Sequence, residues 1–492
     1  MNMPSHNAPT LITIFGGTGD LARKKLLPSL FDLEAKGLLP DTTRIIGFSR
    51  REYAHADYRA FVKEVLAPEG RAGAHKYNDT DIERFLTRIY FQQGDFSAPE
   101  DYQALEQYLF ECDEEIGQCT NKLFYLAVPP HFYERIFDNF KATKLPENCS
   151  DETGWTRVIV EKPFGSSLET ATALEKKLSS VFQEDQIFRI DHYLGKDAVQ
   201  NLLTFRFTNV LFENSWSFED IESVHIRMLE DFGVDGRGEF YDRVGALRDV
   251  GQNHMLQMLA LSAMENPGVL EAHALRGERE KLLRSLRLYT SAEEVALNTV
   301  RGQYEGYHDV DGVVDNSTTE TYFKLRAFID SPRWEGVPFY LESGKQMSEN
   351  RVDITVTFKG KSPCVCGKTE LHEHKNVAVI TLQPEHGVSI RFWAKEPGIH
   401  FDLVEKDLAF DFEDSELEEK VPDAYEKLLY DCIQGDQTLF VSTGEVDAAW
   451  TFITPIVEHW QESGGPELEI YKKGKETEKR EGLEYAWPSD GR

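Results

Sequence analysis

Residues 11–23 read LITIFGGTGDLAR, and this stretch decides the fold of the first part of the chain. The apolar run 11–15 has the length of a buried strand, and a glycine-rich turn follows it directly. A helical pattern begins near Asp20 and ends at Gly37, and a second apolar strand occupies 44–49. This order of strand, glycine-rich turn, helix and strand is the first unit of a doubly wound α/β nucleotide-binding sheet.

The glycine-rich turn has the chemistry of a dinucleotide site. Gly17, Gly19 and Ala22 satisfy the G-x-G-x-x-A spacing. Glycines let the backbone approach a pyrophosphate, and the helix N-terminus that follows favours its negative charge. The alternative is an ordinary tight turn, but the position between a strand and a helix favours a dinucleotide. The residues expected at this cofactor site are Gly16, Gly17, Thr18, Gly19, Asp20, Leu21, Ala22 and Arg23.

The end of the second strand indicates which dinucleotide is bound. Enzymes that use NAD place an acidic residue here for the ribose hydroxyls. This chain has Ser49, Arg50 and Arg51 instead. A guanidinium can bind a 2′-phosphate through two hydrogen bonds, so the strand end predicts NADP as cofactor, with Arg50 as its phosphate contact. The alternative is a solvated basic pair at a strand end.

The rest of the chain divides into two parts. Further buried strands are expected at 122–128 and 157–161, and the pattern changes near Asp191. From 221 onwards the longer strands IESVHIRML, ETYFKLRAFI, RVDITVTFKG, NVAVITLQP and VSIRFWAKE are not regularly interleaved with helices. We therefore predict a Rossmann-like α/β domain at 1–190 and an α+β domain at 191–492, with a large, mostly antiparallel sheet covered by helices on one face.

Three further motifs carry chemistry. Residues 161–165, EKPFG, place Lys162 after a strand, where the ligand crevice of such a sheet lies. Residues 189–196, RIDHYLGK, supply an acid that can orient an imidazole and several donors to a phosphate. Residues 248–254, RDVGQNH, place His254 near an acid, which suits a general base. The alternatives are a solvated lysine, a chance polar turn and a satisfied core histidine.

Charge and composition exclude several classes of protein. The formal net charge is −31, which argues against nucleic acid or an anionic membrane as partner. No apolar run approaches the ~20 residues that span a bilayer, and no secretory signal is visible, so we expect a cytoplasmic protein.

The cysteines indicate neither a disulfide framework nor a metal site. Cysteines at 112, 119, 149 and 432 show no spacing typical of disulfides. Cys364, Cys366, His372 and His374 lie in a polar, lysine-rich segment that we interpret as a surface loop without metal.

Eight blocks in fixed order make the chain resemble the glucose-6-phosphate dehydrogenase family. They are GGTGDLARKKLLP, NKLFYLAVPP, EKPFG, RIDHYLGK, RDVGQNHMLQ, VRGQY, VPFYLESGK and DAYEKLLYD, and the match runs from about residue 11 to residue 461. RIDHYLGK is the most specific of them. The resemblance implies oxidation of glucose 6-phosphate at C1 to 6-phosphogluconolactone with NADP, the first step of the oxidative pentose phosphate pathway. It also implies a homodimer or homotetramer.

The resemblance also implies roles for matching positions. His254 is expected as the general base, with Asp191 as its orienting carboxylate. The expected substrate contacts are Lys25, Lys162, His192, Tyr193, Lys196, Glu230, Asp249 and Lys345, of which His192, Tyr193 and Lys196 would bind the phosphate. Cofactor contacts would further include Arg50, Asp95, Tyr125 and Lys162.

Two departures and two alternatives remain. Glu342 stands where many relatives carry Arg. The insertion that holds Cys364 and Cys366 and the divergent C-terminal end argue against a second, structural NADP site. One alternative is another sugar or polyol dehydrogenase that carries an E-K-P motif but lacks the RIDHYLGK block. The other is a catalytically silent NADP-binding sensor, against which the set Asp191, His254 and Lys196 argues.

Overall fold

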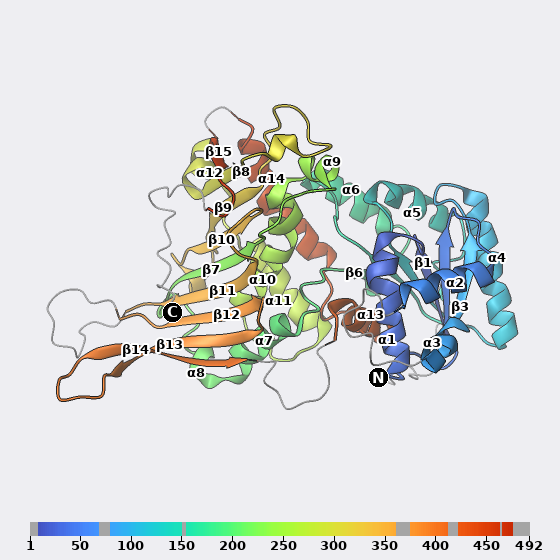
Figure 1. Cartoon of the computed structure of the whole chain (residues 1–492), viewed down its shortest axis with the longest axis horizontal. Coiled ribbons are helices and arrows are strands. Elements are labelled where there is room, and N and C mark those ends of the chain that lie inside the picture. The colour runs from blue at the N-terminus through green and yellow to red at the C-terminus, as the bar shows by residue number, and fades with distance from the viewer. Residues whose placement is uncertain are drawn as a thin grey trace. The chain divides into compact units, whose positions relative to one another are not determined.

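The computed structural model describes residues 8–67, 79–149, 154–360, 374–411, 422–462 and 465–475. The chain forms two compact units (Figure 1). Unit 1 comprises 1–196, 270–276 and 421–446, and unit 2 comprises 197–269, 277–420 and 447–492. Two segments that the sequence analysis assigned to the second domain, 270–276 and 421–446, therefore belong to unit 1. Among the described residues, no helix is long and apolar enough to cross a membrane.

The sheet of unit 1 is six-stranded and wholly parallel, in the order β3-β2-β1-β4-β5-β6. Its strands β1 and β4 lie at the centre and are buried along their whole length, as apolar runs between two helical layers must be. The predicted Rossmann-like fold is confirmed. The strands are β1 (Thr10–Phe15), β2 (Arg44–Ser49), β3 (Ile89–Gln93), β4 (Asn121–Leu126), β5 (Thr156–Val160) and β6 (Ile187–Arg189).

Helices cover both faces of this sheet. One layer consists of α1 (Leu27–Ala35), α2 (His55–Val65) and α3 (Asp79–Leu86), which contact one another, together with α13 (Ala424–Gln434), which packs on α1. The other consists of α4 (Pro99–Ile116), α5 (Tyr133–Lys141) and α6 (Leu168–Leu178). A short π-helix, η1 (Ala22–Leu26), precedes α1, and the 3₁₀ turns η3 (Pro130–Phe132) and η4 (Glu184–Gln186) complete the unit.

Unit 2 contains a nine-stranded sheet in the order β14-β13-β12-β11-β7-β10-β9-β8-β15. Only β10 with β7 and β15 with β8 pair in parallel; the other neighbours are antiparallel, as predicted. The strands are β7 (Ile221–Leu229), β8 (Thr299–Tyr304), β9 (Tyr322–Ala327), β10 (Phe339–Gly344), β11 (Arg351–Phe358), β12 (Val377–Gln383), β13 (Gly387–Lys395), β14 (Leu403–Asp411) and β15 (Leu468–Tyr471).

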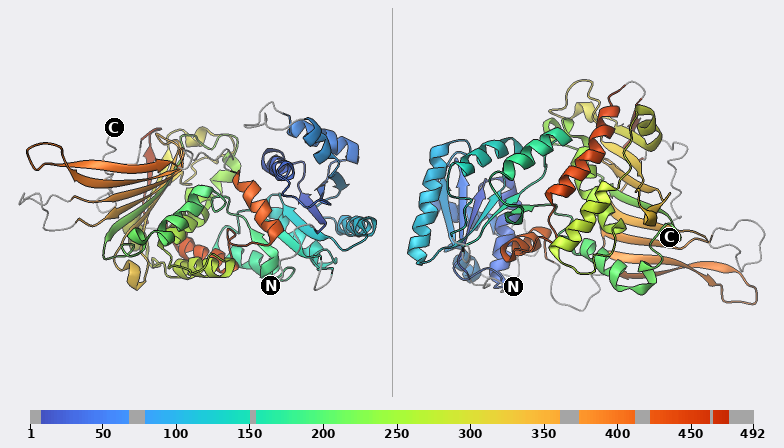
Figure 2. Two further views of the ribbon diagram at one scale, coloured as in Figure 1. Left: turned by 90° about the horizontal axis from the view of Figure 1, so that it is seen from below. Right: turned by 180° about the vertical axis from the view of Figure 1, so that it is seen from behind.

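Helices pack on one side of these strands, as the left view of Figure 2 shows. The π-helix η5 (Leu247–Met255) lies on β7 and β10 and runs into α10 (Leu256–Ala263), every residue of which is buried. The remaining helices are α7 (Asp197–Thr208), which packs on β12 and α10, α8 (Val210–Glu213), α9 (Gly238–Asp242), α11 (Ala272–Arg284), α12 (Ala292–Asn298), the 3₁₀ turns η6 (Tyr307–Asp309) and η7 (Pro332–Trp334), and α14 (Thr443–His459).

The cysteines differ from the expectation in one respect. Cys119 and Cys149 form a disulfide, although their spacing of 30 residues suggested none. The turn before β4 and the loop before β5 bring these two distant positions together, which spacing alone cannot show. Cys112 and Cys432 are buried free thiols. Cys364, Cys366 and His372 lie outside the described residues.

Candidate active site

The predicted cofactor residues of unit 1 gather at one edge of its sheet. Gly16 directly follows β1, Arg50 follows β2, Asp95 lies two residues after β3, and Lys162 lies two residues after β5. Because all six strands are parallel, these positions share the edge formed by the carboxyl ends of the strands. Open sheets of this kind bind their ligands at that edge.

The glycine-rich turn fits a dinucleotide because no side chain could occupy it. Gly16 has φ +83°, and a Cβ there would lie 2.4 Å from the carbonyl oxygen of Ala127. A Cβ on Gly17 would lie 2.7 Å from the Cα of Gly47 on the next strand. The amide of Gly19 donates to the carbonyl of Gly16 at 2.8 Å, which closes the turn. The backbone is therefore bare where a pyrophosphate would approach the start of the helix.

Residues 49–51, at the end of β2, include two cations and no acid. Ser49 is buried and its hydroxyl accepts a hydrogen bond from Thr18 at 3.3 Å, while Arg50 and Arg51 are exposed. Asp95, unlike the two arginines, is bonded to its own turn: its carboxylate accepts a hydrogen bond from the amide of Ser97 at 2.8 Å. The strand end thus offers guanidinium groups to a ligand, and Asp95 shapes the neighbouring turn.

Beside Lys162, the buried Tyr125 is paired with the half-buried Glu161. The phenol of Tyr125 donates to the carboxylate of Glu161 at 2.6 Å, and Tyr133 donates to the carbonyl oxygen of Glu161 at 2.9 Å. Burial raises the pKa of Glu161 above its usual range, although the hydrogen bond from Tyr125 and the charge of Lys162 oppose the shift. Tyr125 and Lys162 were expected at this site from the sequence, whereas Glu161 was not, although it precedes Lys162 in the EKPFG block.

The turn 191–196 follows β6 at the same edge of the sheet. The carboxylate of Asp191 accepts a hydrogen bond from the amide of Tyr193 at 3.0 Å, which fixes the start of the turn. The ammonium of Lys196 lies 3.9 Å from the centre of the Tyr193 ring. Burial lowers the pKa of Lys196 to about 8; the charge of Lys25 acts in the same direction, and that of Asp191 opposes it. A buried ammonium that is disfavoured both by burial and by a neighbouring lysine is a site at which an anion would be stabilised.

Helix α13 brings a distant part of the chain to these residues. The ammonium of Lys25 lies 2.9 Å from the carboxylate of Asp423 and 5.9 Å from the centre of the Tyr425 ring. The rings of His192 and Tyr425 stack with centres 6.2 Å apart and an angle of 12°. Asp423 also caps α13 by accepting a hydrogen bond from the amide of Tyr425 at 2.9 Å. Asp423 and Tyr425 were not expected at the site from the sequence, although both lie in the DAYEKLLYD block.

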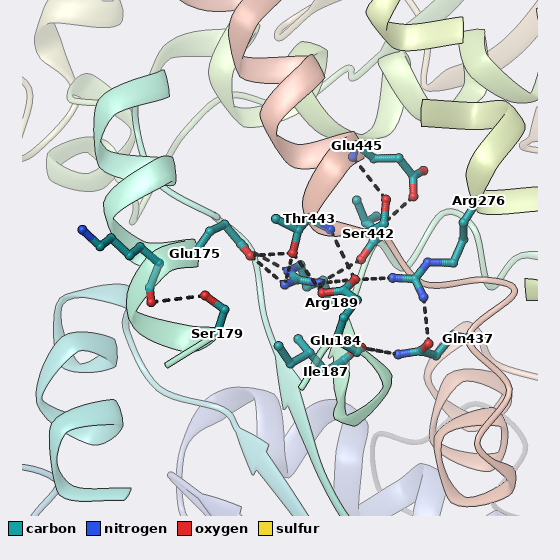
Figure 3. Close-up of polar contacts among 12 residues, drawn as sticks. Glu175, Ser179, Glu184, Ile187, Arg189, Arg276, Gln437, Ser442, Thr443 and Glu445 are labelled. Atoms are coloured by element: carbon teal, nitrogen blue, oxygen red, sulfur yellow. Dashed lines mark hydrogen bonds and ion pairs between the residues drawn. The ribbon is translucent and has the colours of Figure 1, made fainter. Parts of the chain in front are cut away.

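Arg189 ties this returning segment to the strand that leads into the turn. Its guanidinium is fully buried and makes paired contacts with Glu175 at 2.9 and 2.6 Å and with Glu184 at 3.0 Å (Figure 3). It also donates to the hydroxyl of Thr443 at 2.7 Å. The carbonyl of Arg189 accepts from the amide of Val441 at 3.1 Å. Two carboxylates neutralise the buried cation and offset the free-energy cost of its desolvation.

A second arginine completes the network. Arg276 is paired with Glu184 at 2.5 Å and donates to the side chain of Gln437 at 2.7 Å. Gln437 in turn donates to the carbonyls of Glu184 and Ile187, both at 2.8 Å (Figure 3). The segments 270–276 and 421–446 are therefore held on unit 1 by charge-assisted hydrogen bonds around Arg189.

The predicted sugar-binding residues of unit 2 also gather at one edge. Glu230 directly follows β7 and Lys345 directly follows β10, and these two strands are parallel neighbours. Glu230 and Lys345 form an ion pair. The Lys345 ammonium lies 5.2 Å from the centre of the Tyr241 ring. Burial raises the pKa of Tyr241 well above its usual range, and the charges of Asp249 and Glu230 contribute, so Asp249 belongs to the same cluster.

The helix that carries Asp249 and His254 is a π-helix. In an α-helix, residues five apart stand about 140° apart around the axis. In η5 the hydrogen bonds join residues i and i+5, so Asp249 and His254 come close to one face. His254 is 2 % exposed. A Cβ on Gly251 would lie 2.9 Å from the Phe323 ring, so glycine lets the wide helix approach the sheet.

Comparisons with known proteins agree with this arrangement. Residues 13–201 match the model of the glucose-6-phosphate dehydrogenase NAD binding domain, and residues 203–484 match the model of the C-terminal domain of glucose-6-phosphate dehydrogenase. The chain is 36% identical to a glucose-6-phosphate 1-dehydrogenase of Chlamydia pneumoniae, over 96% of this chain and 94% of that protein. It is 39% identical to that of Borreliella burgdorferi, over 91% of each.

Solved structures give the same result. A structure of glucose-6-phosphate dehydrogenase in complex with its substrate glucose-6-phosphate is similar with a TM-score of 0.87 and 34% identity, over 98% of this chain and 97% of that one. The glucose-6-phosphate 1-dehydrogenase of Mycobacterium avium is similar with a TM-score of 0.80 and 32% identity, over 95% of each chain. With two family models covering nearly all of its length, the chain belongs to the glucose-6-phosphate dehydrogenase family.

Proposed function

We propose that this protein oxidises D-glucose 6-phosphate at C1 to 6-phospho-D-glucono-1,5-lactone, with NADP as the hydride acceptor. The observation that carries the proposal is the cluster of two lysines, Lys25 and Lys196, with His192 at the ligand edge of unit 1, beside the dinucleotide turn. A phosphate has the charge and the acceptor oxygens that such a cluster needs. The family relation names the phosphorylated sugar.

The protein's own residues move one proton and hold the sugar. His254 takes the proton of the C1 hydroxyl, because an imidazole titrates near neutral pH. Asp191 orients that imidazole and stabilises its protonated form. Glu230, Asp249 and Lys345 hold sugar hydroxyls, while His192, Tyr193 and Lys196 bind the phosphate, assisted by Lys25 and Lys162. Bound NADP supplies the acceptor for the hydride that leaves C1.

The preference for NADP rests on the end of β2. Arg50 is exposed directly after the strand, and Ser49 and Arg51 supply no carboxylate for the ribose hydroxyls. A guanidinium there favours a 2′-phosphate. Because the whole protein carries a formal net charge of −31, a local cation is needed to attract a ligand with an additional phosphate.

The test is a spectrophotometric assay of NADPH formation by the purified protein. We expect reduction of NADP with glucose 6-phosphate, and much weaker reduction with free glucose or with a polyol. Equal activity on free glucose would favour a different sugar dehydrogenase. Binding of NADP without turnover of any sugar would favour the silent sensor. Asp191→Asn should lower turnover while leaving the KM for NADP unchanged.

A further inference from the structure

The turn that presents Lys345 is held in an unfavourable backbone conformation. Gln346, the next residue, has φ +55°, a region that residues other than glycine seldom adopt. Such a conformation persists only where the surroundings fix it. The position of the Lys345 side chain therefore depends on the hydrogen bonds that hold the main chain of this turn.

The amide groups of the turn are bonded within the body of unit 2. Lys345 donates to the carbonyl of Thr321 at 2.9 Å, Gln346 to that of Phe232 at 3.0 Å, and Met347 to that of Glu230 at 2.9 Å. These bonds join the turn to the strand end that carries Glu230. They leave the carbonyl groups of Lys345 and Gln346 to be satisfied from elsewhere.

Both carbonyl groups accept hydrogen bonds from the C-terminal part of the chain. The hydroxyl of Tyr471 donates to the carbonyl of Lys345 at 2.6 Å, and the amide of Gly474 donates to that of Gln346 at 2.7 Å. Tyr471 is the last residue of β15, which pairs with β8 at the edge of the sheet. A strand more than a hundred residues further along the sequence thus completes the turn.

The hydroxyl of Tyr471 has two carbonyl acceptors within reach, that of Lys345 at 2.6 Å and that of Thr321 at 3.4 Å, and the Lys345 carbonyl is the nearer. Thr321 Oγ1 accepts from the amide of Tyr304 at 3.0 Å and lies 3.0 Å from the Tyr471 oxygen, so the threonine proton is available to the phenol. The Tyr471 ring is 3 % exposed, with its centre 5.7 Å from that of Tyr322. Burial raises the pKa of Tyr471 above its usual range, which keeps its proton in place.

We propose that Tyr471 is a positioning residue for substrate binding, which holds Lys345 against Glu230 through the main-chain carbonyl of Lys345. This inference rests on the proposed function, in which Lys345 and Glu230 hold sugar hydroxyls. The C-terminal strand is then part of the substrate site without touching the substrate. Loss of the hydroxyl frees the turn to leave the strained conformation, and the ammonium of Lys345 moves with it.

The first test is the kinetics of Tyr471→Phe, which keeps the ring and removes the hydroxyl. We expect the KM for glucose 6-phosphate to rise about two- to tenfold, the effect of losing one uncharged hydrogen bond, with kcat and the KM for NADP unchanged. Thr321→Val should also raise the KM for glucose 6-phosphate, whereas Thr321→Ser, which keeps the hydroxyl, should have the wild-type KM. A KM for glucose 6-phosphate equal to that of the wild type would overturn the proposal.

A matched control separates positioning from stability. Tyr289 is also a buried tyrosine of unit 2 whose hydroxyl donates to a main-chain carbonyl, that of Arg326. Tyr289→Phe should lower the melting temperature to a similar extent and leave every KM unchanged. If Tyr289→Phe raises the KM for glucose 6-phosphate as much as Tyr471→Phe does, the effect is general destabilisation and the proposal fails.

Hydrogen exchange tests the turn without any substrate. In the ligand-free protein, the amides of residues 345–347 should exchange faster in Tyr471→Phe than in the wild type or in Tyr289→Phe. Unchanged exchange would refute the proposal, as would faster exchange without a change in KM. If the wild type does not oxidise glucose 6-phosphate, the proposed function fails, and so does the role of Tyr471 in substrate binding. The exchange measurement still shows in that case whether Tyr471 holds the turn.

Discussion

The ammonium group of Lys25 lies 2.9 Å from the carboxylate of Asp423, although 398 residues separate the two in the chain. Lys25 belongs to the π-helix after the glycine-rich turn, and Asp423 caps α13. The pair therefore joins the start of the nucleotide-binding fold to the segment that returns to it. A phosphorylated substrate that contacts Lys25 must share this cation with Asp423.

Asp423→Asn tests this sharing. Asparagine caps a helix as well as aspartate does, so the structure should persist, while the negative charge beside Lys25 is lost. We expect the KM for glucose 6-phosphate to fall about two- to fivefold, the size of an exposed ion-pair effect, with the KM for NADP unchanged. Asp423→Ala, which also removes the cap, should instead lower the melting temperature. A higher KM in Asp423→Asn would mean that Asp423 orients Lys25 rather than competing for it.

Breaking the Arg189 network should destabilise unit 1, because a buried charge is then left without its partner. Arg189→Met leaves Glu175 without its buried partner and should cost about 3–5 kcal/mol of the free energy of unfolding. The double variant Arg189→Met with Glu175→Met should lose much less than the sum of the two single losses, because the two residues form a coupled pair. Additive losses, measured by urea denaturation of the ligand-free protein, would show that the pair contributes no coupling.

Much of the fold could be predicted from the sequence because its signals are local. The apolar run before the glycine-rich turn and the alternating strands from Ile221 to Lys395 have clear periodicity, and one parallel and one mostly antiparallel sheet form as predicted. The return of residues 421–446 to unit 1 could not be predicted, since it depends on contacts such as Lys25 with Asp423. No local pattern encodes a pairing over 398 residues.

The residues of the candidate site differ in the same way in how far the sequence indicates their proximity. Residues within one motif, such as Asp191 to Lys196, were found together because the chain itself keeps them close. The sequence does not distinguish the π-helix at Leu247–Met255 from an ordinary helix, since a wider turn has no distinct composition. Glu161, Asp423 and Tyr425 were missed because their importance arises from the side chains that the fold brings to them.

The lowered pKa of Lys196 predicts a pH dependence of substrate binding. Burial lowers this pKa to about 8, so the ammonium loses its charge as the pH rises through that value. The second ionisation of a phosphate monoester lies near about pH 6, so the substrate does not change charge in this range. We therefore expect the KM for glucose 6-phosphate to rise between about pH 7 and about pH 9.5, because charge-assisted contacts to the phosphate are lost.

Lys196→Arg is the control for this dependence. Arginine remains charged throughout the range, so the KM of the variant should stay nearly constant with pH even if its absolute value differs. An equal rise in the variant and the wild type would assign the titration to another group.

Arg50→Ala should reduce the preference for NADP over NAD. The loss of a charge-assisted contact of about 1.5–3 kcal/mol corresponds to roughly a ten- to hundredfold change in the preference. The change should appear in the KM for NADP, while the use of NAD should hardly alter, because NAD has no phosphate at that position. Arg51→Ala should have a smaller effect. A wild type that prefers NAD, or an unchanged preference in Arg50→Ala, would refute the assignment.

The most direct test of the account is the turnover of the wild type and of His254→Asn with saturating NADP and glucose 6-phosphate. Asparagine keeps polarity and similar size but cannot accept a proton at neutral pH. We expect rapid NADPH formation by the wild type and a turnover about 10²- to 10⁴-fold lower in His254→Asn, with the binding of glucose 6-phosphate largely retained in calorimetric titration. A wild type without activity on glucose 6-phosphate, or a variant whose turnover stays within about tenfold of the wild type, would contradict the proposed function or the role of His254 as its general base.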